Sequence, residues 1–176
     1  HVDSGSYDES ETDVDVVKYA LTLERLEEEL YAVGLDTYSE EELIAATEFA
    51  ESEELGQLVP GYVTTLNEHE ASHAQQLEAV LEVLGAEIPE PPELSFGLES
   101  AGQFLETARV VENTGVAAYA GVAPRVESPD ILSFALSIHS VEARHAATLN
   151  GLLGQTPFPN AYDSALSVSE VLEAVD

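Results

Sequence analysis

Four long stretches of this chain carry apolar residues at the spacing of an α-helix, and a glycine or a proline follows each stretch. The stretches are residues 13–33, 62–84, 100–123 and 129–153. No segment shows the sustained alternation of apolar and polar residues that is typical of a half-buried strand. Amphipathic helices of this length bury their apolar faces against one another, so the pattern predicts an all-α fold, a bundle of four long helices.

Two shorter helices are predicted outside the four long ones. Ser39 and Glu42 form a capping-box motif, which opens a short acidic helix that reaches about residue 54. Ser167 and Glu170 form a second capping box, which opens a terminal helix through residue 175. The predicted architecture is therefore a four-helix bundle with short extra helices.

Proline marks the connection between the second and third long helices. Residues 87–93 contain three prolines, which favour a stiff, extended segment that is long enough to cross an end of a bundle. The chain has 176 residues, the size of one domain. We expect a flexible acidic leader at residues 1–12 and one bundle domain at residues 13–176.

The charge balance limits both the partners and the environment of the protein. Asp and Glu total 35, Lys and Arg total 5, and the formal net charge is -30. Such a surface repels nucleic acid and anionic lipid, so we exclude both as partners. It also repels itself, which destabilises a compact chain unless salt screens the charges. The apolar content of 44% argues against a disordered acidic chain, so we expect a folded protein with the composition of a halophile, working in concentrated salt.

Missing residue types restrict the chemistry and bear on localisation. The chain has no cysteine, so it has neither a disulfide nor a thiolate metal site. It starts at His1 and contains no methionine, which we interpret as a processed or trimmed product and, with the polar leader, as an indication of an exported protein at the cell surface or outside the cell. No run of apolar residues is long enough for a transmembrane helix.

Two Glu-x-x-His motifs are the clearest chemical pattern. Glu70 precedes His73 by three residues in the second long helix, and Glu142 precedes His145 in the same way in the fourth. At this spacing the carboxylate and the imidazole lie on one face of a helix, so that one metal ion can contact both. Glutamate is abundant in this chain, so a single such motif is only modest support for a metal site.

The first and third long helices strengthen the metal hypothesis. Glu24 and Glu112 each follow an apolar residue, and a tyrosine stands seven residues further on, at Tyr31 and Tyr119. The surroundings of Glu112 are apolar and small, and burying an unpaired carboxylate there would cost several kcal/mol, so a cation is its natural partner. Glu27, in the acidic run after Glu24, remains the alternative to Glu24 as the ligand of the first helix.

This fourfold pattern resembles the ferritin-like superfamily of di-iron carboxylate proteins, and within it the branch described as desiccation-related. The resemblance lies in residues 19–31, 69–73, 108–119 and 139–145. It implies an antiparallel bundle with a long crossover between helices 2 and 3. By position it also implies a role for each of the six residues. Glu24 and Glu112 would be terminal carboxylates, and Glu70 and Glu142 bridging carboxylates. His73 and His145 would be terminal imidazoles.

The function that this resemblance implies depends on two metal ions. Carboxylates and imidazoles without thiolates suit iron, which is the expected metal, while manganese and zinc fit the same ligands. The implied activity is that of a ferroxidase or oxidoreductase that reacts with oxygen or peroxide. The alternative is a non-enzymatic, exported and stress-related structural subunit that uses the bundle as a scaffold and self-associates.

Four other residues near these motifs have structural interpretations. For His69 a place on the rim of the site is the favoured interpretation, with support of a ligand and binding of a neighbouring ion as alternatives. For His139 hydrogen bonding to a ligand and plain packing are equally good interpretations. Tyr31 and Tyr119 are expected to be packed core residues with a hydrogen-bonded hydroxyl.

Overall fold

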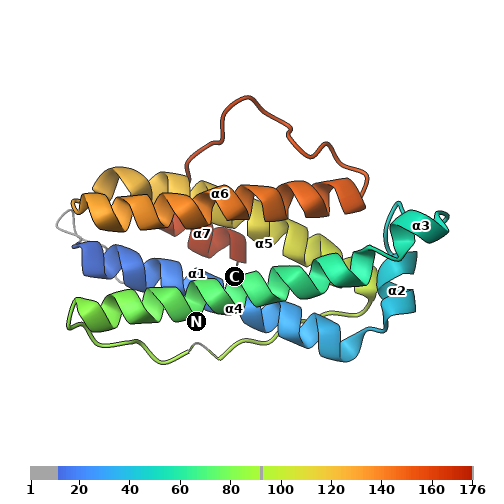
Figure 1. The fold of residues 1–176 in the computed structure, drawn as a ribbon, viewed down its shortest axis with the longest axis horizontal. Coiled ribbons are helices and arrows are strands. Elements are labelled where there is room, and N and C mark those ends of the chain that lie inside the picture. Colours follow the sequence, from blue (N-terminus) through green and yellow to red (C-terminus); the bar gives the residue numbers. More distant parts are fainter. Residues whose placement is uncertain (1–11, 92, 176) are drawn as a thin grey trace.

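The computed structural model describes residues 12–91 and 93–175, which form an antiparallel bundle of four long helices (Figure 1). The long helices are α1 (Asp13–Thr37), α4 (Val59–Val83), α5 (Ala101–Val122) and α6 (Pro129–Leu152). The shorter elements are α2 (Glu40–Ala45), α3 (Glu53–Gly56), the 3₁₀ turn η1 (Ala123–Arg125) and α7 (Val168–Val175). No β-strand occurs in the described ranges, and the predicted all-α bundle with short extra helices is confirmed.

The long helices form two antiparallel pairs. Helix α1 packs on α4, α5 packs on α6, and α1 also packs on α5 between the pairs. The chain after α4 runs outside the bundle, back along its length, so that α4 and α5 point in the same direction (Figure 1). Arg25 on α1 links this crossover to the bundle. Its guanidinium donates one hydrogen bond to the carbonyl of Pro89 in the crossover at 2.6 Å and another to Glu78 on α4 at 2.6 Å. The long crossover between the second and third bundle helices is therefore present, but it follows the length of the bundle and does not merely cross one end.

Several predicted helix ends are confirmed. The hydroxyls of Ser39 and Ser128 accept hydrogen bonds from the first turns of α2 and α6, and Ser167 accepts one from the first turn of α7. Gly85 and Gly154 have φ values of 67° and 71° just after α4 and α6, where a side chain would be strained. Of the predicted leader only Thr12 is described, and Pro92 of the crossover also lies outside the described residues.

Two predicted boundaries are wrong for local reasons. Helix α4 begins at Val59 and not at residue 62, because Pro60 stands in the first turn, where its missing N–H has no helical partner to lose. The predicted acidic helix stops at Ala45, and α3 follows only after a turn. In that turn the Thr47 hydroxyl donates to a backbone carbonyl at 2.9 Å and accepts from the N–H of Phe49 at 3.2 Å, which competes with helix continuation.

Gly34 does not end α1, as its position in the sequence predicts, but lies inside the helix. The ring of the fully buried Phe104 on α5 packs directly on the backbone there, and a Cβ on Gly34 would stand 2.3 Å from that ring. The glycine therefore serves the close approach of α1 and α5, and the helix continues to Thr37.

We expect Gly34→Ala to lower the free energy of unfolding by about 1–3 kcal/mol, because the buried Phe104 ring must move to admit the methyl group. Gly61→Ala in α4 is the matched control, since nothing lies within 4 Å of its Cβ position. That control should be neutral or slightly stabilising, because alanine favours a helix over glycine by about 1 kcal/mol. Urea denaturation of both variants measures the difference, and equal stability of the two would contradict the assignment of Gly34.

Apolar side chains form three clusters, one of which packs α7 on α1 and α5, while the other two follow one another along the bundle axis. One of these two, toward the α2 end, contains Leu30, Leu66, Phe104 and Leu149. The other, toward the opposite end, contains Leu21, Leu77, Leu81 and Ile138. The polar residues of the predicted site fall between these clusters on every long helix, so they occupy a layer that apolar side chains close off above and below. No helix in the described ranges has the length and apolarity needed to cross a membrane.

Candidate metal centre

The six predicted site residues meet inside the bundle, and each long helix contributes to the group. Helix α1 supplies Glu24, α4 supplies Glu70 and His73, α5 supplies Glu112, and α6 supplies Glu142 and His145. All four carboxylates are 0% exposed. Four ionisable groups without any contact with water are rare in a core of this size, and they need partners of opposite charge.

The six residues form two overlapping groups of four. One group is Glu24, Glu70, His73 and Glu142, and the other is Glu70, Glu112, Glu142 and His145. Within each group, one nitrogen or oxygen atom per residue lies within 4.8 Å of the others. Glu70 and Glu142 belong to both groups, so their carboxylates lie between two adjacent positions where a cation can be held.

Each imidazole turns one nitrogen toward three carboxylates. Nδ1 of His73 lies 3.0 Å from Glu24, 3.0 Å from Glu70 and 3.1 Å from Glu142. Nδ1 of His145 lies 2.7 Å from Glu70, 3.4 Å from Glu112 and 3.7 Å from Glu142. The two imidazoles therefore occupy equivalent places, one in each half of the cluster.

Several buried atoms of the cluster lie close together without forming hydrogen bonds. Nδ1 of His145, both oxygens of Glu142 and one oxygen each of Glu70 and Glu112 have no hydrogen-bond partner among the described residues. Leaving such groups unpaired is costly in a protein interior. One ligand atom from each of these four residues lies within 4.8 Å of the others, so a cation placed among them would satisfy atoms that the protein itself does not, and the residues fit a metal pair.

Two tyrosines orient the outer carboxylates across the bundle. The hydroxyl of Tyr31 on α1 donates to Oε1 of Glu112 on α5 at 2.5 Å, and the hydroxyl of Tyr119 on α5 donates to Oε1 of Glu24 on α1 at 2.5 Å. The other oxygen of each carboxylate, Oε2, remains directed at an imidazole. Burial raises the pKa of both tyrosines well above the usual value, so the hydroxyls stay protonated donors. The expected role of these tyrosines, packed with a bonded hydroxyl, is confirmed.

Charge in the cluster is divided unevenly between the carboxylates. Burial raises the pKa of Glu24 to about 7 and also raises those of Glu112 and Glu142. Burial acts in the same direction on Glu70, but the close approach of the His145 and His73 imidazoles outweighs it and lowers that pKa to about 2. Without a cation, these carboxylates therefore either bind protons or depend on a protonated imidazole.

The pKa values of both imidazoles are raised, because carboxylates surround the two rings. Burial alone would lower the pKa of His73, but the surrounding carboxylates raise it to about 12, and the same balance raises the pKa of His145 to about 10. A metal ion needs the neutral form of the imidazole, so metal binding at neutral pH would displace these protons.

His69 lies at the rim of the site and also contacts a candidate ligand, so it combines two of the three interpretations given from the sequence. The residue is exposed at the rim, yet its ring stacks on His145 with centroids 5.1 Å apart. Its Nδ1 lies 2.9 Å from Nε2 of His145, the nitrogen that faces away from the carboxylates. Such a contact fixes the ring orientation of a ligand. His139, by contrast, buries its Nδ1 without a hydrogen-bond partner among the described residues.

Glu27 is the buried carboxylate that sequence reasoning ranked second to Glu24. It is 2% exposed and faces the same interior one turn further along α1. Burial and the negative charges of Glu142 and Glu112 raise its pKa well above the usual value. Its three-residue spacing from Glu24 matches that of the Glu-x-x-His motifs, which is the pattern that could have indicated it.

Comparison with known proteins identifies similarity over most of the chain. A sequence profile of the ferritin-like domain matches residues 12–155. The chain is also 24% identical over 160 residues to Protein rds1 of Schizosaccharomyces pombe. That alignment covers 91% of this chain and 37% of the yeast protein, so the chain spans little more than a third of the length of that relative.

Proposed function

This chain belongs to the ferritin-like domain family, and from that premise we propose that its buried glutamates and histidines bind two metal ions for redox chemistry with dioxygen or peroxide. One observation carries the proposal. Two four-residue groups of carboxylates and imidazoles lie side by side and share Glu70 and Glu142. A shared pair of carboxylates between two nitrogen ligands is the arrangement that holds two cations close together in a helix bundle.

The proposed ligand roles follow from the two groups. Glu24 and His73 would bind one ion, and Glu112 and His145 the other. The carboxylates common to both groups would bridge the two ions. Oxygen and imidazole donors without a thiolate favour iron or manganese, and zinc is the third candidate. We propose iron. The four carboxylates neutralise two divalent cations, and the two imidazoles remain as donors when an ion of the pair is oxidised to a higher charge.

A bound iron pair would supply electrons for the reduction of dioxygen or peroxide. The protein's own residues prepare the site for that chemistry. Tyr31 and Tyr119 hold the outer carboxylates in place, and His69 holds the ring of His145. The apolar clusters on both sides keep bulk water away from the cluster, while His73 retains 13% of its side-chain surface in contact with solvent. This asymmetry supports access of a small reactant along the α4 side.

We expect Glu142→Ala to reduce the metal content strongly and Glu112→Ala to reduce it from about two ions per chain to about one, because the first carboxylate is shared and the second is not. Elemental analysis after anaerobic loading with Fe²⁺ measures the content. Glu106→Ala on α5 is the control, since it removes an exposed carboxylate from the same helix as Glu112. Unchanged metal content in both site variants would contradict the proposed site.

Activity is tested separately from binding. Oxygen uptake on addition of Fe²⁺ to the metal-free protein supports ferroxidase-type chemistry. A protein that is fully folded without metal, binds none and assembles into larger particles would instead support an exported, desiccation-related structural subunit that self-associates. Elemental analysis of protein isolated from its native source decides between iron, manganese and zinc.

A further inference from the structure

One buried carboxylate has no role in the six-residue site. The side chain of Glu27 is fully buried on α1, and its Oε1 atom has no hydrogen-bond partner among the described residues. Nor does any lysine or arginine of the described chain form a salt bridge with it. A carboxylate in this position is strongly destabilising unless something positive approaches it.

The two halves of the bundle are equivalent at most site positions but differ at this one. Glu24 on α1 corresponds to Glu112 on α5, and the tyrosine that follows each of them seven residues later corresponds as well. By the same offset, the counterpart of Glu27 is Gly115. One half therefore has an additional carboxylate where the other half has no side chain at all.

Gly115 provides the space that the carboxylate of Glu27 occupies. A Cβ at Gly115 would stand 3.0 Å from Oε1 of Glu27 and 3.5 Å from Oε2 of Glu142. The oxygen of Glu27 thus extends from α1 to the backbone of α5, beside a carboxylate that both metal positions share. The extra carboxylate on α1 therefore occupies the space that the absence of a side chain on α5 leaves free.

We propose that Glu27 is a fifth carboxylate ligand of the metal pair and that it makes the site prefer a pair containing a trivalent ion. This inference rests on the proposed metal binding. Four carboxylates balance two divalent cations, and a fifth balances the added charge when one of the ions is trivalent. In a buried site an unbalanced charge is poorly screened, so the additional carboxylate acts on selectivity between charge states.

The test compares a divalent and a trivalent probe that have no redox chemistry, Zn²⁺ and Ga³⁺ supplied as its citrate complex. Glu27→Gln keeps the shape of the side chain and removes its charge. We expect its affinity for Ga³⁺ to fall about 10- to 100-fold relative to the wild type, while its affinity for Zn²⁺ changes by less than about threefold. Competition titrations with a chromophoric chelator measure both affinities.

Two further variants separate charge from packing. Glu28→Gln is the matched control, because Glu28 is the neighbouring residue on α1, lines a surface pocket and undergoes the same change of charge. It should leave both affinities unchanged. Gly115→Ala keeps every charge but places a methyl group against the carboxylate of Glu27, so we expect a smaller loss of Ga³⁺ affinity in the same direction. Thermal melting of each metal-free variant verifies that it is folded.

The outcomes distinguish this inference from the proposed function. A wild-type protein that binds neither probe overturns the metal site itself. A wild-type protein that binds both, with a Glu27→Gln variant that behaves like Glu28→Gln, overturns the role of Glu27 and leaves the six-residue site standing. Equal loss of both affinities in Glu27→Gln overturns the preference for a trivalent ion. Only selective loss of Ga³⁺ supports the inference.

Discussion

Removal of the proposed metal pair at neutral pH is expected to lower the free energy of unfolding by about 3 kcal/mol or more, the gain that a ligand provides at about one hundred times its dissociation constant. The physical reason is the group of five buried carboxylates, Glu27 and the four of the six-residue site. With cations present, each carboxylate has an opposite charge nearby. Without them, the protein must protonate these groups or accept their mutual repulsion in a medium that screens it poorly.

The direction of the pH dependence follows from the shifted carboxylates. Burial raises the pKa of Glu24 from 4.5 to about 7, and it raises those of Glu27, Glu112 and Glu142 in the same direction. A group whose pKa is higher in the folded state contributes stability that is fully present below its unfolded pKa and is lost as the pH rises through its folded pKa. The metal-free protein should therefore become less stable from pH 4.5 to pH 7.

The remaining site groups do not reverse this trend. Glu70, with its pKa lowered to about 2, changes stability only below pH 4.5. The raised pKa values of His73 and His145, about 12 and about 10, begin to reduce stability only above the ordinary histidine value of 6.5, again as the pH rises. Loading with metal should oppose the loss, because metal binding displaces the protons and strengthens with pH.

Thermal melting of chelated and metal-loaded protein at about pH 5 and about pH 8 measures both effects, in about 1 M salt so that surface repulsion is screened to a few ångströms. We expect the loaded and chelated proteins to differ most at the higher pH. Glu24→Gln is the variant that tests the cause, and its chelated form should lose less stability between the two pH values. Identical melting of chelated wild type at both pH values would contradict the linkage.

The grouping of the six residues in the bundle interior could be predicted largely because the two Glu-x-x-His motifs are local patterns. In Glu70-x-x-His73 and Glu142-x-x-His145 the helix itself brings the two side chains of each motif to one face, whatever surrounds the helix. Glu112 could be recognised because it is a carboxylate on a helix face whose other residues are apolar and small. Helical periodicity placed these faces in the core, and the structure brings them together there.

The contacts that were missed depend on two helices at once. Glu27 belongs to a run of acidic residues, and its three-residue spacing from Glu24 makes it only an alternative to Glu24, whereas the packing of α1 against Gly115 shows that both carboxylates are buried. His69 supports His145 through the position of α6 relative to α4. Gly34 could equally have been a helix end or a helix contact, and the ring of Phe104 on another helix decides between them.

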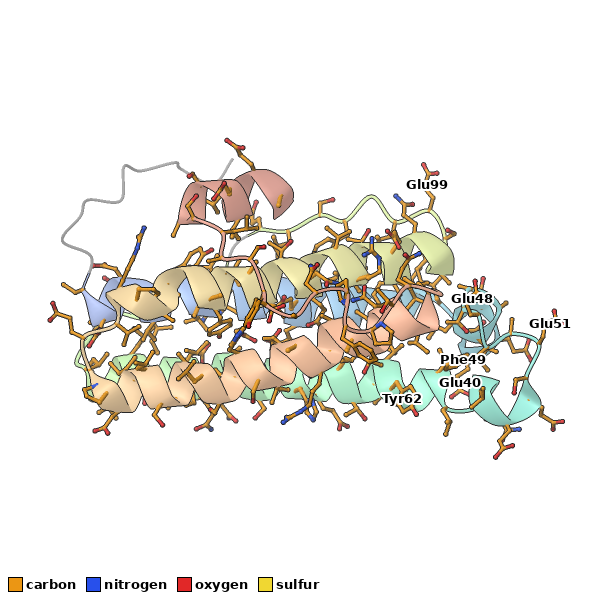
Figure 2. All side chains as sticks on the ribbon, turned by 90° about the horizontal axis from the view of Figure 1, so that it is seen from above. Glu40, Glu48, Phe49, Glu51, Tyr62 and Glu99 are labelled. Carbon is orange, nitrogen blue, oxygen red and sulfur yellow. The ribbon has the colours of Figure 1, made fainter. Side chains whose placement is uncertain are left out.

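Dilution into low salt is expected to lower the melting temperature of the protein by about 10 °C or more. The chain has a formal net charge of -30, and most of this charge lies on side chains that are exposed. Figure 2 shows Glu40, Glu48, Glu51 and Glu99 at the same end of the bundle, with the first three around α2 and α3 and Glu99 just before α5. Like charges that gather in this way repel one another over the Debye length, about 3 Å at 1 M salt and about 30 Å at 0.01 M.

Repulsion at low salt acts on the folded protein more than on the unfolded chain, because folding brings the carboxylates together. In a chain of this size each kcal/mol of lost stability lowers the melting temperature by about 2–4 °C, so a loss of about 4 kcal/mol lowers it by about 8–16 °C and gives the expected shift. A variant with Gln in place of Glu40, Glu51, Glu53 and Glu54 keeps the metal site and should depend less on salt. A matched change of buried charge, Glu27→Gln, should leave the salt dependence as it is, because screening ions do not reach the core. If the wild type melts at the same temperature in both salts, surface repulsion does not limit the stability of this bundle, and the acidic composition needs another physical explanation.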